Sequence, residues 1–142
     1  MKQMIFTCLT AVIVAMTAVA EAETAGPKTE TEIDGVWLLT EFTITDTQGN
    51  VTEWCEGSYG VIMYTEGYMS TAINCKSDPK KVLLYSGPFE FAQGRVTHHA
   101  RNFSDPSLNR AFDRSARIED DQLTLSGTLG DGGTATVKWL RR

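Results

Sequence analysis

The sequence predicts an all-β fold: an up-and-down antiparallel β-barrel preceded by a signal peptide. Three observations predict it. Apolar and polar residues alternate with a period of two, turn-forming residues recur at short intervals, and no mature segment of 11 or more residues carries a 3.6-residue apolar stripe. The chain has 142 residues, which suits one domain with its own core and leaves no room for a second.

Alternation is clearest near the C-terminus, where leucines alternate with Thr and Ser in residues 123–129, and Ala, Val and Trp alternate with Thr and Lys in residues 134–139. Seven to nine short strands are expected, and sequential hairpins favour a closed meander. No run of Lys or Pro blocks an exposed edge, which also favours closure. Turn signals separate the strand-length segments at Asp46–Asn50, Glu66–Gly67, Ser77–Pro79, Gln93–Gly94, Ser104–Ser107, Glu119–Asp121 and Gly130–Gly133.

The first 22 residues differ from the rest of the chain. Lys2 supplies a positive start, residues 4–20 carry no charge, and small residues at 18, 20 and 22 offer two cleavage sites. A retained membrane anchor is the alternative, but the apolar run is shorter than the ~20 residues of a spanning helix. We expect residues 1–22 to be a signal peptide, 23–33 a flexible lead and 34–142 the barrel, in a periplasmic or secreted protein without membrane association after cleavage.

Cleavage would leave Cys55 and Cys75 as the cysteines of the mature chain, in a compartment where disulfides persist. If Glu66–Gly67 is a two-residue hairpin turn, Ser58 faces Cys75, and Cys55 lies at the same end of that hairpin. A Cys55–Cys75 disulfide is therefore expected, with two separately packed thiols as the alternative. No CxxC or HxxxH spacing is present, so no metal site is expected.

The charge of the chain bears on the class of partner. The formal net charge is −5 and no basic run occurs, which argues against nucleic-acid binding, because phosphate neutralisation dominates that affinity. No nucleophile elbow, Ser-His-Asp pattern or phosphate-binding glycine loop is present, and no cofactor is expected. The oligomeric state is left open.

Several segments carry a family resemblance. Gly35-Val36-Trp37 resembles the Gly-x-Trp signature that opens the first strand of lipocalins and related calycin barrels. Over about residues 35 to 128 or further, the chain resembles the bacterial and fungal lipocalin-like domain family of small barrels. The segments that carry this resemblance, in order, are Gly60–Tyr64, Gly67–Ser70, Tyr85–Phe89, Val96–His99 and Leu123–Leu125.

The resemblance implies an up-and-down barrel with an internal cavity, in a family of diverse functions. It also implies that Trp37 packs at the closed end against a basic residue of the last strand, Arg141 or Arg142, as a cation on an aromatic face. The cysteine pair, and a C-terminus without an obvious flanking helix, depart from typical members.

Strand parity assigns several polar-tipped side chains to the interior, because residues i and i+2 share a face. His98 shares the parity of Val96 and Ala100, whereas His99 has the opposite parity. Tyr and His at such positions can also be ordinary core residues that need one hydrogen-bond partner. The set expected to line one cavity is Tyr64, Met69, Tyr85, Phe89, His98, Phe112 and Arg114.

Arg114 is the most demanding of these residues, because a guanidinium stays charged and is costly to bury unpaired. Asp113 faces the other way, so we expect the counter-charge to be Glu41 or a ligand carboxylate. A strand rotated so that Arg114 is exposed is the alternative.

An apolar cavity with a few convergent polar groups is the usual form of a small-molecule site. The sequence therefore predicts an exported barrel that binds a small amphipathic or aromatic molecule in its interior, with an anionic group as one option. Two alternatives belong to other classes: an enzyme that uses His98 as general acid or base with Tyr64 or Tyr85 as donor, and a protein-interaction or inhibitor module.

Overall fold

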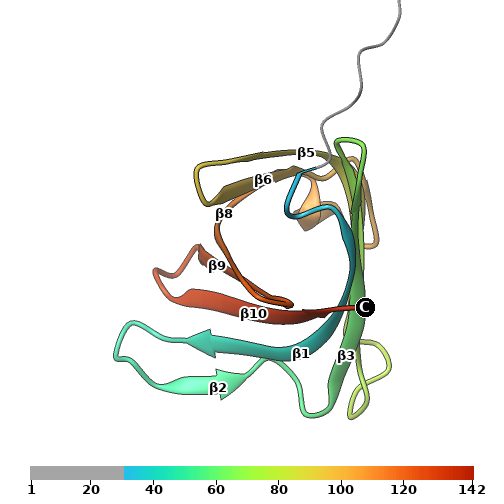
Figure 1. Ribbon diagram of the computed structural model, residues 1–142. Coiled ribbons are helices and arrows are strands. Elements are labelled where there is room, and N and C mark those ends of the chain that lie inside the picture. The colour runs from blue at the N-terminus through green and yellow to red at the C-terminus, as the bar shows by residue number, and fades with distance from the viewer. Residues whose placement is uncertain (1–30) are drawn as a thin grey trace, which may run out of the picture.

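The structure is a computed structural model that describes residues 31–142, so the predicted signal peptide and most of the predicted lead lie outside the described residues. Ten strands form one sheet that closes into a barrel (Figure 1). The elements are β1 (Gly35–Thr45), β2 (Val51–Glu53), β3 (Ser58–Thr65), β4 (Tyr68–Cys75), β5 (Val82–Ala92), β6 (Arg95–His99), β7 (Asn102–Phe103), the 3₁₀ helix η1 (Pro106–Leu108), β8 (Ala111–Glu119), β9 (Gln122–Thr128) and β10 (Thr134–Arg141).

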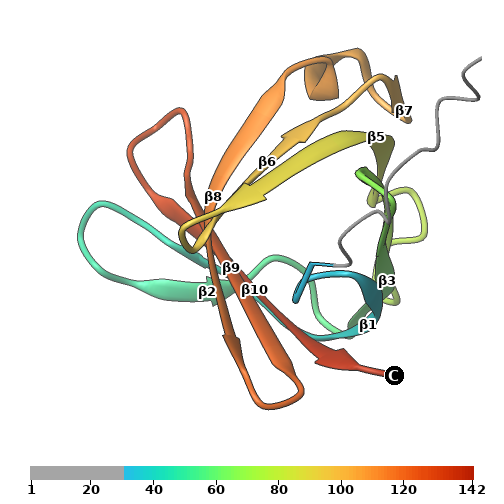
Figure 2. The ribbon, with the colours of Figure 1, turned by 45° about the horizontal axis from the view of Figure 1, so that its top comes forward.

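Eight of the strands make the closed ring, in the order β1, β3, β4, β5, β6, β8, β9 and β10. Each is antiparallel to the next, and β10 returns to pair along β1, from Trp37 opposite Arg141 to Thr45 opposite Thr134. The short strands β2 and β7 pair with β1 and β5, and Figure 2 shows β7 next to β5, beyond the end of β6. The predicted all-β, up-and-down antiparallel barrel is confirmed.

Tight turns fix the register of neighbouring strands. Glu66 and Gly67 both have positive φ, 49° and 79°, as a type I′ hairpin turn requires. The predicted register follows, with Ser58 opposite Cys75. Gln93 and Gly94, with φ of 52° and 70°, make the same kind of turn between β5 and β6.

The predicted disulfide is confirmed: Cys55 and Cys75 are bonded, with their Cα atoms 5.7 Å apart. The bridge ties the segment before β3 to the end of β4. A persistent disulfide is typical of an oxidising, non-cytoplasmic compartment. Within residues 31–142, no helix has the length and apolar character needed to cross a bilayer.

Because successive side chains of a strand point to opposite faces of the sheet, every second residue faces the barrel interior. In β4 the buried positions are every second residue from Met69 to Cys75, and in β6 they are Val96 and His98. Large side chains fill the interior. Those almost completely buried are Trp37, Trp139, Tyr64, Ile33, Ile62, Met69, Leu123, His98, Val96 and Thr71.

The residues just before β1 pack against the barrel. Ile33 is completely buried, and its carbonyl accepts a hydrogen bond of 2.9 Å from the Trp37 indole N–H. The Arg141 guanidinium lies 4.1 Å from the Trp37 ring and donates to the backbone carbonyls of Glu32 and Asp34. Of the two basic residues considered for this position, Arg141 occupies it.

Candidate functional site

His98 lies at the centre of the barrel with none of its surface exposed, whereas His99 faces outward and contacts Glu90. Both ring nitrogens of His98 meet tyrosine hydroxyls: Nε2 is 2.7 Å from the Tyr64 oxygen, and Nδ1 is 3.0 Å from the Tyr85 oxygen. The strands β3, β5 and β6 thus each contribute one member of a buried polar chain.

The partners of His98 determine its tautomer. Arg114 Nη1 lies 3.3 Å from His98 Nδ1 and 3.3 Å from the Tyr85 oxygen, and a guanidinium can only donate. Nδ1 is therefore the acceptor, and the Nε2–H donates to Tyr64. The Tyr85 hydroxyl donates to Nδ1 and accepts from Arg114.

Burial keeps the side chains of His98 and Tyr64 neutral. Desolvation holds the pKa of His98 well below its usual value of 6.5, and the positive charge of Arg114 lowers it further, followed by His99. Desolvation also raises the pKa of the Tyr64 phenol well above 10.0. Both His98 nitrogens are occupied, so neither is free to exchange a proton with a substrate.

Arg114 is half-buried and stacks on Phe112, with its guanidinium carbon 4.9 Å from the ring centre. Among residues 31–142, no carboxylate forms an ion pair with it. The expectation that Glu41 supplies the counter-charge is wrong, because Glu41 faces outward and pairs with Lys138 at 2.9 Å. Asp113 also faces outward and pairs with Arg95.

A small cavity of about 20 Å³ lies inside the barrel formed by residues 31–142. Tyr85 and Arg114 contribute to its wall together with Thr71, Trp139 and apolar side chains. Such a volume suits one water-sized occupant and excludes an aromatic molecule. Of the other residues expected to line the interior, Met69 is packed in the core, Phe89 contacts Tyr64 edge-on, and Phe112 stacks on Tyr85.

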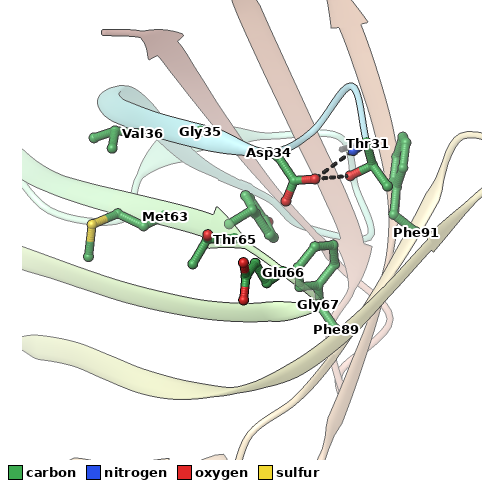
Figure 3. A pocket seen from close by; sticks show the side chains of 11 residues that line it. Thr31, Asp34, Gly35, Val36, Met63, Thr65, Glu66, Gly67, Phe89 and Phe91 are labelled. Atoms are coloured by element: carbon green, nitrogen blue, oxygen red, sulfur yellow. Dashed lines mark hydrogen bonds between the residues drawn. The ribbon is translucent and has the colours of Figure 1, made fainter. Parts of the chain in front are cut away.

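A much larger pocket, of about 790 Å³, lies at the rim of the barrel where β1 begins. It exists because β5, with 11 residues, runs beyond the eight-residue β4: Pro88 is its last residue paired with β4, and Phe89 and Phe91 follow. Figure 3 shows these two rings at one end of the pocket and Val36 and Met63 at the other. Tyr64 forms part of the pocket, next to Phe89.

Asp34 is the main polar feature of this rim pocket that the sequence did not suggest. Its Oδ2 accepts hydrogen bonds from the backbone N–H and the hydroxyl of Thr31, at 2.6 and 2.9 Å. Its Oδ1 is buried and has no hydrogen-bond partner. A buried carboxylate oxygen without a donor is costly, and a bound ligand that donates a hydrogen bond would remove that cost.

Two further residues were absent from the set expected to line the cavity. Phe91 has the inward parity of Phe89, and that parity was the available signal. Trp139 has an indole N–H that is buried without a partner, which no sequence pattern indicates. Within the described residues, no group of three or more His, Cys, Asp or Glu could hold a metal ion.

Comparisons with known proteins add little to this geometry. No family model matches the sequence, and no curated protein matches it. A redesigned β-barrel is similar in structure with a TM-score of 0.48 and 16% sequence identity, over 78% of this chain and 91% of that chain. A de novo designed fluorescence-activating β-barrel gives a TM-score of 0.47 and 11% identity, over 77% of this chain and 93% of that chain.

Proposed function

We propose that this protein is an exported barrel that binds a small amphipathic molecule in the rim pocket. The observation that carries the proposal is a pocket of about 790 Å³ that combines aromatic walls with a buried, unpartnered oxygen of Asp34. Ligand sites are commonly 300–1,000 Å³ and are mostly apolar, with a few polar groups that fix orientation. The apolar part of the ligand lies against Phe89 and Phe91.

The rim is favoured over the barrel centre as the binding position on the basis of volume. The central cavity of about 20 Å³ is too small for any aromatic ligand. Tyr64 and His98 are therefore positioning residues for the pocket wall: their hydrogen bond of 2.7 Å holds the Tyr64 ring against Phe89.

The polar end of the ligand is a hydrogen-bond donor, and an ammonium group fits best. Asp34 Oδ1 needs a donor, and a cation would make the stronger, charge-assisted bond. Glu66 also lines this pocket.

We also propose that the chain is a lipocalin-like barrel that is exported. Gly35 and Trp37 match the signature of such barrels, and the stacking of Arg141 on Trp37 at 4.1 Å supports the resemblance. The Cys55–Cys75 disulfide supports an oxidising compartment, periplasmic or extracellular.

The test uses arylalkyl amines, alcohols and carboxylates that share one hydrocarbon part. Each is titrated into ¹⁵N-labelled purified protein, and amide shifts are followed by NMR. We expect the amine to shift amides at residues 31–36, 65–67 and 89–91. Asp34→Asn keeps an acceptor for Thr31 and should weaken amine binding about 10-fold or more, the loss of one charge-assisted hydrogen bond, with little effect on the alcohol.

Phe91→Ala tests the apolar wall and should weaken all three probes. Its control is Leu84→Ala, an exposed residue on the outer face of the same strand, which should leave binding unchanged. If no probe shifts the rim amides, or if Asp34→Asn binds the amine as tightly as the original protein, the proposal is wrong.

A further inference from the structure

The small central cavity is lined mainly by apolar side chains, but its wall also includes polar residues that the proposed rim site does not use. The indole N–H of Trp139 is buried and has no hydrogen-bond partner, and the exposed fraction of Trp139 is 1%. Trp139 contributes to the wall of the cavity together with Arg114. A buried donor without an acceptor is costly, so an occupant that accepts a hydrogen bond would stabilise this arrangement.

The charge in this cavity is uncompensated by protein groups. Arg114 donates to the Tyr85 hydroxyl and to His98 Nδ1 at long distances of 3.3 Å, and neither partner is a carboxylate. The buried polar residues of the described chain are Thr71 and His98, so no carboxylate is among them. A guanidinium that is partly removed from water attracts an anion more strongly than it would in bulk solvent.

The backbone of β9 makes room for the aliphatic part of the Arg114 side chain. Gly127 occupies an inward position of β9, and a Cβ built there would lie 3.2 Å from Arg114 Cγ. The first half of β8 pairs with β6 and its second half pairs with β9. Arg114 belongs to the first half, so it has no pairing partner in β9. Arg114 remains partly exposed, which leaves a route between the cavity and solvent.

We infer that the central cavity binds one monatomic anion of the halide class, held by Arg114 and the Trp139 indole N–H. A water molecule would accept from Trp139 but would leave the guanidinium without a counter-charge. A halide accepts a hydrogen bond from the Trp139 indole N–H and also supplies a negative charge opposite the guanidinium. The volume of about 20 Å³ excludes polyatomic anions such as sulfate or acetate.

The crystallographic test is a soak in sodium bromide, with diffraction data collected at the bromine absorption edge. We expect one anomalous peak inside the barrel, in contact with Arg114 and Trp139. Density at that position without anomalous signal identifies a water molecule and overturns the inference.

The solution test measures the melting temperature of the purified chain against sodium bromide and sodium chloride, with sodium gluconate at the same ionic strength as reference. We expect halides to raise the melting temperature in a saturable way that gluconate does not reproduce. Trp139→Phe and Arg114→Met should abolish the halide-dependent increment, whatever their own stability. Arg117→Met, on the outer face of the same strand and paired with Glu119, should retain it.

An increment that persists in Arg114→Met, or that is equal in gluconate, would show that the halide acts elsewhere and would overturn the inference. The rim pocket plays no part in either measurement, so this outcome leaves the proposed ligand site unaffected.

Discussion

Acidification should destabilise this protein through His98. In the folded state burial holds the pKa of His98 well below 6.5, whereas in the unfolded chain it returns to about 6.5. As the pH falls below 6.5, the His98 imidazole binds a proton in the unfolded state but stays neutral in the folded state. His98 therefore costs no stability above about pH 7.5 and lowers the free energy of unfolding as the pH decreases through 6.5.

The magnitude follows from one proton. Between pH 7.5 and 5.5, a group with an unfolded pKa of 6.5 that stays neutral in the folded state removes about 1.4 kcal/mol of stability. The slope approaches about 1.4 kcal/mol per pH unit at lower pH and vanishes once the pH falls below the folded pKa.

The assay is urea unfolding of the oxidised protein at pH 7.5, 6.5 and 5.5, with His98→Gln and His99→Gln for comparison. His98→Gln loses hydrogen bonds at every pH, and this constant cost does not affect the comparison between pH values. We expect the original protein and His99→Gln to lose about 1.4 kcal/mol more than His98→Gln between pH 7.5 and 5.5. Equal losses in all three proteins would refute the reasoning, because His98 would then accept a proton in the folded state.

Two further predictions concern the barrel itself. Gly87→Ala should lower the free energy of unfolding by about 3 kcal/mol, because a Cβ there would lie 1.9 Å from the His99 carbonyl oxygen. The control Gly130→Ala should change the free energy of unfolding by less than about 0.5 kcal/mol, because a Cβ there would meet nothing within 4 Å. Chemical denaturation measures both values. Arg141→Met should lower the free energy of unfolding by about 2 to 3 kcal/mol, because it removes two hydrogen bonds to backbone carbonyls and the contact with Trp37. Arg142 has an exposed side chain, so an equal effect of Arg142→Met would contradict this structural role of Arg141.

The topology was predictable because local signals determine it. The Glu66–Gly67 turn fixes the register of β3 on β4, and strand parity then decides which side chains face inward. Ten strands occur where seven to nine were expected. The difference arises because β2 and β7 have three and two residues, too few for an alternating pattern to be recognised.

The sequence predicted which side chains of the strands face inward, but it did not predict where the pocket lies. Parity alone placed His98 and Arg114 on the inner face, and the structure shows His98 completely buried and Arg114 half-buried. Parity carries no information about volume, and it says nothing of a residue outside the strands, such as Asp34. The partner of Arg114 was also unpredictable, because Glu41 lies beyond the irregular pairing between Leu39 and Glu41 that changes the register of β1 against β10.

The position of the pocket follows from the size of the inward side chains. An eight-stranded barrel has an interior that side chains can just fill, and here Trp37, Tyr64 and Trp139 occupy much of it. Space for a ligand can then arise only where the wall is uneven. The strand β5 runs beyond the β3–β4 hairpin, so Phe89 and Phe91 line a pocket that paired strands of equal length would have closed. Unequal strand length, rather than a hollow centre, is therefore what gives this barrel a site large enough for an organic molecule.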